Sequence, residues 1–462
     1  MGNRSSPVAG IILAAGKGVR MKSDLPKVLH LLGGEPLISH VKTVCKKLPL
    51  EKIVVVVNFQ AAEIKKILGE EVKYVEQKEP LGTGHAVLST RPFFEDFTGD
   101  LMVVYGDAPF LKAETLQRLL EEHRNCGNVA TLLTAFLPSP SGYGRIVRNA
   151  RGEVERIVEE MDASPEEKAI KEVNSGVYCF RVSSVFEALA EIKPENRSGE
   201  YYLTDVIEII HQRGWRVGTV KTEDNLEITG INTRKELVQA EKMLRERILE
   251  NLIEEGVTVV DPSTTFIGLA VKAGKDTVIS PFTILEGETI IGENCKIGPY
   301  THISDSRIGD RVEIIHSVIF GSRIEEEAKI GPYTHLRPGT IIHKQVRVGN
   351  FVEVKKSTIG KSSRISHLSY LGDTTVGEMV NIGAGTITCN FDGFKKHPTV
   401  IENGAFIGSG TILIAPVKVG KNAITGAGAV IPKGKNVPAD SVVVGMPAKI
   451  LKYKNKKKLS KS

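Results

Sequence analysis

Aliphatic residues recur at every sixth position through much of the second half of the chain. This spacing fits neither the 3.6-residue period of an α-helix nor the two-residue alternation of a simple strand, so it indicates a repeat architecture. The register comprises Ile324, Ile330, Leu336, Ile342, Val348 and Val354, and it resumes at Ile401, Ile407, Leu413 and Val419 before it reaches Thr425 and Ile431.

The repeat predicts a parallel β-helix of triangular section, with one short strand per hexad and the aliphatic side chain pointing inward. Each buried aliphatic side chain contributes roughly 1.5–3 kcal/mol, and no coil can bury its own row without neighbours stacked on it. Glycine often follows the aliphatic residue, where we expect it to supply the backbone freedom that a tight corner needs. These glycines are Gly298, Gly331, Gly349, Gly383, Gly408 and Gly420.

The hexads break between Thr388 and Thr399, so this segment must loop out of the prism. For an arbitrary insertion a surface excursion without function is the favoured interpretation. Insertions in solenoids also map to one face, often the binding face. Basic residues on adjacent coils, at Arg337, Lys355 and Lys356, and His367 beside them favour a binding site here.

The first half of the chain reads as an α/β nucleotide-binding domain. The apolar run Val8–Leu13 predicts a buried strand that opens into a glycine-rich basic loop, which is suited to phosphates. A dinucleotide signature is not met, because Met21 stands where its third glycine belongs. Ile53–Val57 and Leu101–Tyr105 predict further strands, and Asp107 after the latter is placed for a metal, although such an Asp is more often a turn or helix cap.

A continuous helical pattern separates the two halves, because Thr233–Gly256 carries neither proline nor glycine before its end. We read it as a connecting helix capped by Thr233. The predicted domains are a nucleotidyltransferase domain at residues 1–232, a linker helix at 233–256 and a β-helix domain at 257–462.

Composition narrows the class of protein. The 462 residues are 41% hydrophobic and 25% charged, which is typical of a globular chain, and the net charge of +6 suits anionic substrates. Five scattered cysteines predict reduced thiols in the cytoplasm. No apolar run has the length of a membrane span, and we expect no nucleic-acid partner and no integral membrane association. The C-terminal lysines read as a solvated terminus: Lys449, Lys452, Lys454, Lys456, Lys457, Lys458 and Lys461.

Short motifs of the first half occur in a specific order, although each alone is a weak signal. Together they resemble the signature of sugar-1-phosphate nucleotidylyltransferases and, more narrowly, the bacterial bifunctional N-acetylglucosamine-1-phosphate uridyltransferase/glucosamine-1-phosphate N-acetyltransferase family. The likeness runs from Val8 to about Lys449. The motifs are Leu13–Met21, Leu25–Lys27, Gln77, Leu81–His85, Tyr105–Asp107, Gly142–Arg145, Ile157–Glu159, Asn174–Gly176 and Gly199–Asp205.

The resemblance implies that the first domain transfers a uridylyl group from UTP to N-acetylglucosamine 1-phosphate. It implies Mg²⁺ at Asp107 and Asn232, and charge stabilisation by Arg20 and Lys27. It assigns the uracil to Gln77, Gly82 and Thr83, and the acceptor sugar to Gly144, Glu159, Asn174 and Thr204. The remaining implied UTP and UDP-sugar contacts are Leu13, Ala14, Ala15, Gly16, Tyr105 and Gly106. The chain departs from the family at Val19, where threonine is usual, and at Pro80, where glutamine is common.

For the second domain the resemblance implies a left-handed β-helix that transfers acetyl from acetyl-CoA to glucosamine 1-phosphate. His367 would be the general base and Glu353 would orient its ring. The implied sugar-phosphate residues are Arg337, Lys355, Tyr370, Asn381 and Lys396. Asn390 would position the amine and is also assigned, with Ala384, Phe391, Ser409, Ala427 and Gly445, to the acetyl-CoA site; Phe391 stands where tyrosine is frequent, and Gly445 where some relatives carry arginine.

The resemblance also implies a homotrimer, because the looped-out segment would lean on an adjacent subunit. Two other functions were weighed. One is a nucleotidylyltransferase whose β-helix only oligomerises or regulates, and the full set His367, Tyr370, Asn390 and Lys396 argues against it. The other is a non-catalytic binding protein, for which Arg20, Lys27 and Asp107 would be surplus.

Overall fold

The computed structural model describes residues 6–58 and 61–453, and it divides into two compact units, one ending at Glu241 and one beginning at Lys242. Most of the predicted C-terminal lysines, from Lys454 onward, lie outside the described residues. The division falls inside helix α8 (Arg234–Glu254), so the functional domain boundaries stay a prediction. Within the described residues, no helix combines the length and the apolar character needed to cross a bilayer.

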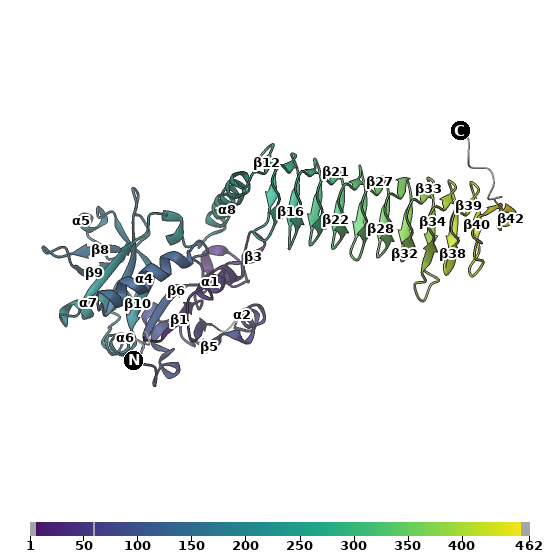
Figure 1. The fold of residues 1–462 in the computed structure, drawn as a ribbon. Helices are drawn as coiled ribbons and strands as arrows, with labels where there is room; N and C mark the ends of the chain where they lie inside the picture. The colour runs from purple at the N-terminus through teal and green to yellow at the C-terminus, as the bar shows by residue number, and fades with distance from the viewer. Residues whose placement is uncertain (1–5, 59–60, 454–462) are drawn as a thin grey trace, which may run out of the picture. The chain divides into compact units, whose positions relative to one another are not determined.

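The first unit is built on a mixed β-sheet with strand order β11-β7-β10-β6-β1-β4-β5 (Figure 1). β10 alone runs antiparallel to its neighbours in this path, and β8 and β9 form a hairpin at its edge. The strands are β1 (Val8–Leu13), β4 (Ile53–Val57), β5 (Lys73–Glu76), β6 (Asp100–Tyr105), β7 (Ala130–Phe136), β8 (Arg145–Arg148), β9 (Val154–Val158), β10 (Glu172–Arg181) and β11 (Val217–Lys221), with a separate pair β2 (Leu31–Leu32) and β3 (Glu35–Pro36).

Helices cover both faces of this sheet. Alternate residues of β1 belong to different buried clusters, Ile11 to one and Ile12 to the other, which is why the whole strand is apolar. The helices are α1 (Leu37–Cys45), α2 (Ala61–Leu68), α3 (Thr83–Leu88), α4 (Ala113–Asn125), α5 (Pro165–Lys168), α6 (Val182–Leu189) and α7 (Asp205–Gln212), with 3₁₀ turns η1 (Val19–Met21), η2 (Lys27–Leu29), η3 (Gly69–Glu71), η4 (Arg91–Phe93) and η5 (Asn225–Ile228).

The chain order reverses between β1 and β6. From β1 the parallel strands proceed to β4 and β5 on one side, whereas β6 pairs on the other. Ligands of open α/β sheets bind outside the carboxyl ends of the strands at such a switch point. The predicted strands Val8–Leu13, Ile53–Val57 and Leu101–Tyr105 are confirmed, the last of them extended by one residue to Asp100.

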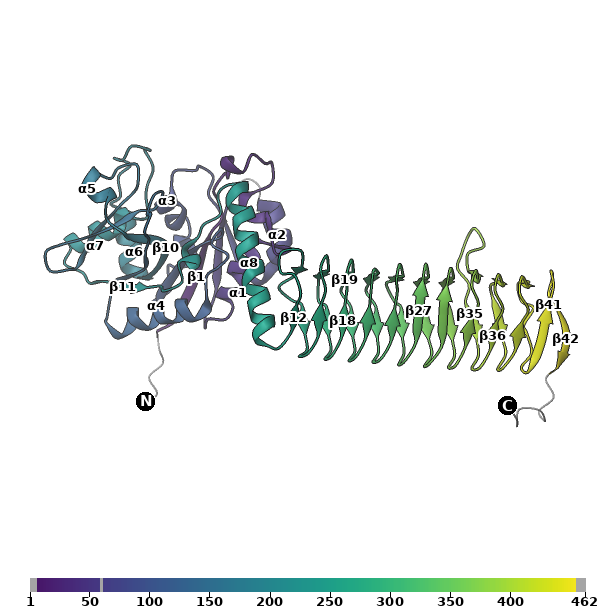
Figure 2. The ribbon, with the colours of Figure 1, turned by 90° about the horizontal axis from the view of Figure 1, so that it is seen from above.

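The second unit is a stack of triangular coils, which confirms the predicted parallel β-helix (Figures 1 and 2). Its first sheet contains β12 (Thr258–Val259), β15 (Val278–Ile279), β18 (Lys296–Ile297), β21 (Glu313–Ile314), β24 (Lys329–Ile330), β27 (Arg347–Asn350), β30 (Arg364–His367), β33 (Asn381–Ile382), β36 (Phe406–Ile407), β39 (Ile424–Thr425), β41 (Ser441–Val444) and the antiparallel β42 (Lys449–Tyr453). Its second sheet contains β13 (Phe266–Ile267), β16 (Ile284–Glu286), β19 (His302–Ser304), β22 (Val318–Phe320), β25 (His335–Arg337), β28 (Glu353–Lys355), β31 (Tyr370–Gly372), β34 (Ile387–Cys389), β37 (Ile412–Ile414) and β40 (Val430–Ile431). Its third sheet contains β14 (Lys272–Ala273), β17 (Ile290–Ile291), β20 (Arg307–Ile308), β23 (Arg323–Ile324), β26 (Ile341–Ile342), β29 (Thr358–Ile359), β32 (Thr374–Val376), β35 (Thr399–Ile401) and β38 (Val417–Val419).

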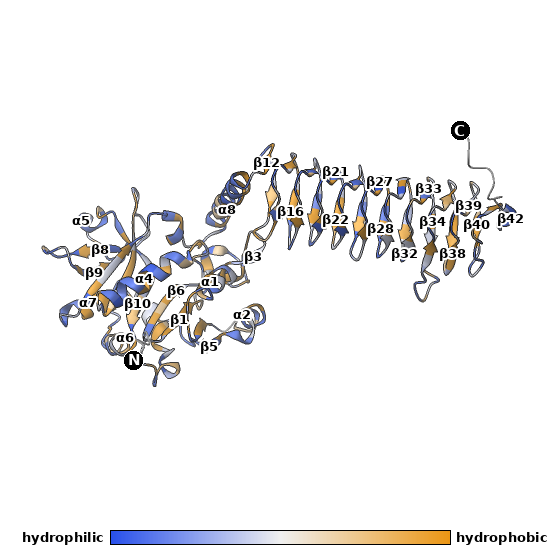
Figure 3. Ribbon diagram, viewed as in Figure 1, coloured by the Kyte–Doolittle hydropathy of each residue, from blue (hydrophilic) through white to orange (hydrophobic). Residues whose placement is uncertain are grey.

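The aliphatic register points into the prism as predicted, and Figure 3 shows hydrophobic residues along its strands. Every residue from Ile324 to Val354 in the register is buried, as is the resumed row from Ile401 to Ile431. Each row packs on the row of the neighbouring coil, so the core is continuous along the prism axis.

The glycines of the hexads serve a different purpose from the one expected at four of the six positions. Gly298 and Gly331 do have positive φ, at 94° and 101°, but the other four are absent from the left-handed region. At Gly349 a Cβ atom would lie 2.0 Å from the Ser366 carbonyl oxygen of the next coil, and at Gly420 it would lie 2.5 Å from the Ala439 nitrogen. These glycines therefore permit close stacking of coils rather than a special corner conformation.

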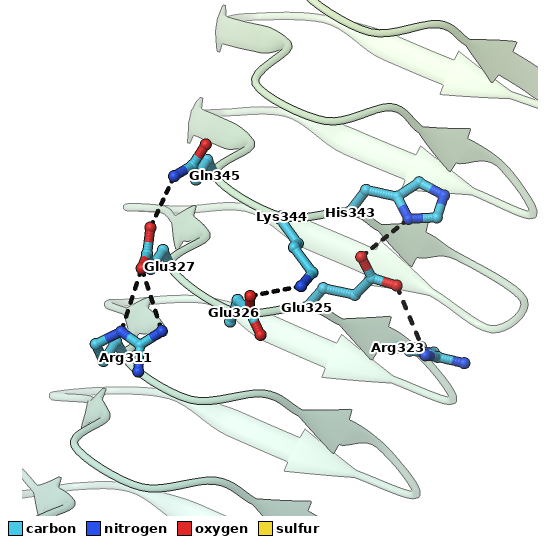
Figure 4. Close-up of polar contacts among 8 residues, drawn as sticks. All are labelled: Arg311, Arg323, Glu325, Glu326, Glu327, His343, Lys344 and Gln345. Carbon is cyan, nitrogen blue, oxygen red and sulfur yellow. Dashed lines mark hydrogen bonds and ion pairs between the residues drawn. The ribbon is translucent and has the colours of Figure 1, made fainter.

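Non-glycine residues occupy most of the left-handed corner positions instead. At the corner between the third and first sheets these residues are polar and contact one another from coil to coil (Figure 4). Arg311 and Gln345 both donate to Glu327, at 3.2 and 2.8 Å, and beside them Lys344 donates to Glu326 at 2.6 Å. We call this the polar corner; its members are Asp276, Asn294, Arg311, Glu327, Gln345 and Ser362.

Candidate active sites

The loop after β1 is held close to η2 by a glycine. Gly18 has φ 61°, and a Cβ atom there would lie 2.7 Å from Cβ of Lys27. Glycine therefore lets the loop pass directly over Lys27. The loop leaves the sheet through Leu13, Ala14, Ala15 and Gly16, and Gly106 at the end of β6 lies beside it, 3.3 Å from the Leu13 carbonyl oxygen in terms of a built Cβ.

Four predicted site residues converge at this switch point. Lys27 forms an ion pair with Asp107 and donates to Oδ1 of Asn232 at 2.9 Å. Arg20 donates to the same Asn232 oxygen, also at 2.9 Å. The four side chains come from the loop after β1, from η2, from the end of β6 and from the start of α8. Two cationic side chains next to one carboxylate make a centre suited to a polyphosphate.

The oxygen pair of this cluster fits a magnesium ion. Asp107 and Asn232 already direct their oxygens at a single cation, the Lys27 ammonium group. No set of three or more His, Cys, Asp or Glu side chains that could hold a metal occurs within the described residues. This agrees with the habit of Mg²⁺, which uses one or two protein oxygens and completes its shell with water and substrate phosphates.

The predicted uracil contacts surround the start of α3. Gln77 is buried and donates from Nε2 to the Gly82 carbonyl oxygen at 3.0 Å. Gly82 has φ 112°, and a Cβ there would lie 2.6 Å from the Tyr201 carbonyl oxygen, so only glycine fits. The Thr83 hydroxyl accepts from the Leu203 amide at 3.0 Å. The structure thus joins the Gln77 loop to the segment that precedes α7.

The predicted acceptor-sugar residues also gather in one place. The Thr204 hydroxyl donates to Glu159 at 3.1 Å, and the Asn174 amide donates to the Gly144 carbonyl oxygen at 2.9 Å. A Cβ built on Gly144 would lie 3.4 Å from Oε2 of Glu159 and 3.6 Å from Cβ of Asn174. Burial raises the pKa of Glu159, and the Thr204 hydrogen bond partly offsets it.

Two further residues belong to this pocket. Tyr105 lies against Gly176, where a Cβ would be 2.6 Å from its ring, and burial raises the pKa of its hydroxyl. Asp205, which the motif contained but no role was assigned to, follows Thr204 at the start of α7. Burial, followed by the nearby charges of Glu159, Glu208 and Asp162, raises its pKa to about 6.

In the prism, one corner carries several of the predicted acetyl-CoA residues. Successive coils stack there through backbone hydrogen bonds from Gly385 to Leu368, from Gly410 to Ala384 and from Gly428 to Ser409, at 3.0, 2.7 and 2.7 Å. The structure therefore aligns the residues that precede these turns in one column between the first and second sheets. The column consists of His367, Ala384, Ser409 and Ala427.

The partner of His367 differs from the predicted one. His367 Nδ1 lies 2.5 Å from Oδ1 of Asn350, which is the residue one coil earlier in register. Glu353 instead accepts from Arg337 at 3.0 Å, and no hydrogen bond joins it to His367 in the part of the chain that the structure describes. The expected orienting contact is thus corrected to Asn350. The coil spacing of 17 residues was the signal that could have identified it.

The predicted sugar-phosphate cations cluster on the adjacent second sheet. Arg337, Lys355 and Gly372 are aligned in register on successive coils. The Lys396 amine beside Lys355, through hydrogen bonding and charge repulsion, lowers the pKa of Lys355. Like charges gathered in this way are suited to an anion such as a phosphate. Tyr370 lies at the same place, because a Cβ on Gly372 would be 2.5 Å from its hydroxyl.

The looped-out segment is an ordered excursion between β34 and β35. Asp392 accepts from the amides of Phe394 and Lys395, at 3.0 and 2.9 Å, and contacts His397 at 2.5 Å. Asn390 donates to Asp373 at 2.5 Å, which anchors the start of the loop beside Gly372. Asp373 is a further polar residue that the sequence did not single out.

Three predicted residues are less closely tied to this centre. Asn381 lies on the first sheet, in register with Arg364 and Phe406. Phe391 is exposed and forms an isolated bridge with Lys396. Gly445 has φ 91°, and its carbonyl oxygen accepts from the Val430 amide at 3.1 Å. No contact that the structure prints links these three to His367.

Two protein families match the chain. The nucleotidyl transferase family matches residues 9–230, and the bacterial transferase hexapeptide (six repeats) family matches residues 321–356 and 398–433. With the parallel stacking of the coils, the second match supports the predicted left-handed β-helix class. A solved UDP-glucose pyrophosphorylase complexed with UDP-glucose is 17% identical, covers 52% of this chain and 99% of its own, and has a TM-score of 0.45, too weak a likeness to bear on function.

Curated relatives match almost the entire chain. "Bifunctional protein GlmU" of Heliobacterium modesticaldum is 50% identical over 94% of this chain and 94% of its own length. The proteins of that name from Carboxydothermus hydrogenoformans and Thermotoga maritima are 48% and 49% identical over 96% of this chain and over 98% and 97% of their own lengths. Full-length matches to bifunctional relatives disfavour a prism that only oligomerises and a protein without catalysis. The chain therefore belongs to the GlmU family, the bifunctional uridyltransferases and acetyltransferases that its motifs predicted.

Proposed function

We propose that the two activities of this family are divided between two separate anion-binding centres of the chain. The observation that carries the proposal is that each unit contains its own group of cations. Arg20 and Lys27 gather beside Asp107 in the first unit, and Arg337, Lys355 and Lys396 gather beside the His367 column in the second. The products of the two centres combine into UDP-N-acetylglucosamine.

In the first centre, a phosphate oxygen of N-acetylglucosamine 1-phosphate attacks the α-phosphorus of UTP. The bond from that phosphorus to the bridging oxygen breaks, and pyrophosphate leaves with the electron pair. Both reactants are anions, so the residues act mainly by positioning and by neutralising charge. Arg20 and Lys27 bind the triphosphate, and Glu159 with Thr204 orients the sugar.

Asp107 and Asn232 would hold Mg²⁺, which supplies charge neutralisation on the phosphates when it is bound. Binding of substrate then replaces the contact that Lys27 makes with the two oxygens and frees its ammonium group for a phosphate oxygen. Gln77, Gly82 and Thr83 take the uracil edge, and the residues from Leu13 to Gly16 with Tyr105 and Gly106 bound the nucleotide site.

In the second centre, the amine of glucosamine 1-phosphate attacks the thioester carbon of acetyl-CoA. His367 accepts the amine proton at Nε2, because its Nδ1 proton is donated to Asn350. The thiolate of CoA leaves and takes up a proton. Arg337, Lys355, Tyr370, Asn381 and Lys396 hold the sugar phosphate, and Asn390 positions the amine. Acetyl-CoA lies along Ala384, Ser409 and Ala427, with Phe391 and Gly445 farther out.

We further propose a homotrimer in the cytoplasm, with functional domains at residues 1–232, 233–256 and 257–462. Five free cysteines support a reducing compartment. The excursion at residues 390–398 supports assembly, because Phe394 at its tip is 95% exposed and gains burial only against another molecule.

The test is one incubation of the full chain with glucosamine 1-phosphate, acetyl-CoA, UTP and Mg²⁺, in which free CoA and pyrophosphate are both followed. We expect CoA release first and pyrophosphate only after it. With N-acetylglucosamine 1-phosphate as acceptor, pyrophosphate should form without acetyl-CoA. Removal of Mg²⁺ with EDTA should stop pyrophosphate formation and leave CoA release intact. Pyrophosphate formed from glucosamine 1-phosphate without acetyl-CoA would contradict the proposal.

A further inference from the structure

One edge of the prism carries aromatic side chains where its geometry favours small polar ones. At the corner between the first and second sheets, successive coils place five rings in left-handed backbone conformation, with φ between 44° and 58°. A bulky residue in this conformation is an outlier, whereas asparagine, aspartate and glycine adopt it readily. We call this set the aromatic column; it consists of Phe282, Tyr300, His316, Tyr333 and Phe351.

The polar corner shows that the fold does not itself require rings at such turns. It repeats the same backbone conformation on the same coils with Asn294, Arg311, Glu327 and Gln345. The aromatic column is therefore selected for something other than the turn. Part of the explanation is stacking between coils, since neighbouring rings lie 4.8–5.6 Å apart between centroids.

Stacking alone leaves much of this surface in water. Phe282, Tyr300, Tyr333 and Phe351 are each about half exposed in the single chain. Half of the area of an aromatic side chain is about 100 Å², so the column exposes about 500 Å². Exposed apolar residues adjoin it and enlarge the patch toward the roughly 800 Å² that each partner buries in a standard interface. These neighbours are Phe266, Ile284, Ile315, Val318 and Leu368.

We propose that the aromatic column is the surface on which a second copy of this chain docks. The occupant follows from the repeat: rings spaced at the stacking distance of coils are matched rung by rung only by a surface with the same spacing, and a second copy has it by construction. This inference rests on the proposed homotrimer and specifies the face that builds it.

The docking surface runs directly into the acetyltransferase centre. After Phe351 the same corner continues with Leu368, next to His367, and then with Gly385, Gly410 and Gly428, which have no side chains. The rings therefore end where the column of His367, Ala384 and Ser409 begins. A second copy bound to the rings extends along this open stretch and forms the outer wall of the acetyl-CoA groove.

The test compares two double substitutions that put asparagine into equivalent turns. Tyr300→Asn with Tyr333→Asn removes two rings, and Arg311→Asn with Glu327→Asn changes the polar corner as a matched control. Asparagine suits the left-handed conformation, so both variants should fold and should form UDP-N-acetylglucosamine from N-acetylglucosamine 1-phosphate at the wild-type rate. By sedimentation equilibrium, the ring variant should associate roughly 100-fold or more weakly than the wild type, and the control should not change.

A second measurement uses the unmodified protein and does not depend on the folding of a variant. Tyr300, Tyr333 and Tyr453 are 58%, 57% and 61% exposed in the single chain. In hydroxyl-radical labelling of the assembled protein, Tyr300 and Tyr333 should be protected and Tyr453 should not. Equal labelling of the three, or a ring variant that stays assembled, overturns the docking surface while the trimer stands. A monomeric wild type overturns the trimer and the docking surface together.

Discussion

At the scale of single residues, His367 depends on a neighbour one coil away. The contact of its Nδ1 with Asn350 fixes the tautomer in which Nε2 can accept the amine proton. Asn350→Ala should therefore lower the kcat of acetyl transfer about 5- to 10-fold, the effect of one hydrogen bond, and alter its pH profile. The assay is CoA release across pH, with the uridyltransferase rate as the internal control.

Glu353 should behave differently because it contacts Arg337 rather than His367. Glu353→Gln is expected to raise the KM for glucosamine 1-phosphate and to leave the pH profile of kcat in place. If Glu353→Gln instead changes the profile and Asn350→Ala does not, the orienting role returns to Glu353 and the corrected assignment fails.

Asp205 gives a pH-dependent prediction for the first unit. Its pKa is raised to about 6, so the folded state binds a proton more tightly than the unfolded state, and stability falls as pH rises from about 4 to 6. Above that window Asp205→Asn should increase the free energy of unfolding by about 1 kcal/mol, a value reduced for partial solvent screening. At pH 4.5 the gain should largely vanish.

Calorimetry of wild type and variant at pH 4.5 and 8 measures this difference. Glu114→Gln is the control, because Glu114 is an exposed acid in the first turn of another helix, α4. An equal change in stability at both pH values, or the same pattern in the control, would show that the environment of Asp205 is not the cause.

At the scale of elements, stacking between coils requires glycine where backbones come close. A Cβ at Gly420 would lie 2.5 Å from the Ala439 nitrogen, whereas at Gly268 the nearest atom is 3.5 Å away. Gly420→Ala should destabilise the prism by about 1–3 kcal/mol through overpacking, and Gly268→Ala should be close to neutral. Denaturant titration followed by far-UV circular dichroism measures both, and a neutral Gly420→Ala would refute the stacking role.

The elements of this fold were largely predictable from the sequence, because burial imposes a period. The hexads required Ile324 and its successors to face inward, and the apolar runs Val8–Leu13 and Ile53–Val57 required a sheet covered on both faces. The role of Gly349 and Gly420 was not predictable, since it depends on the distance to the next coil rather than on the local chain.

The sites were predictable as sets of residues but not as contacts. The convergence of Arg20, Lys27, Asp107 and Asn232 depends on segments more than 200 residues apart, and only the motifs signalled it. The partner of His367 was missed because a family pattern assigned Glu353, although the coil register already paired His367 with Asn350. The aromatic column was also hidden, because its residues alternate among Phe, Tyr and His at one turn of each coil.

At the scale of the whole molecule, the account claims two independent catalytic centres on one chain. Lys27 contacts only residues of the first unit, and His367 contacts Asn350 within the prism. Each centre should therefore be removable without loss of the other. This independence is what separates a bifunctional enzyme from a transferase with an accessory prism.

The most direct test measures both reactions separately in Lys27→Ala and His367→Ala. Lys27→Ala should reduce pyrophosphate release from UTP and N-acetylglucosamine 1-phosphate by roughly 100-fold or more and should leave CoA release near the wild-type rate. His367→Ala should do the reverse. Wild-type acetyl transfer in His367→Ala, or loss of both reactions in either variant while the protein stays folded, would contradict the account.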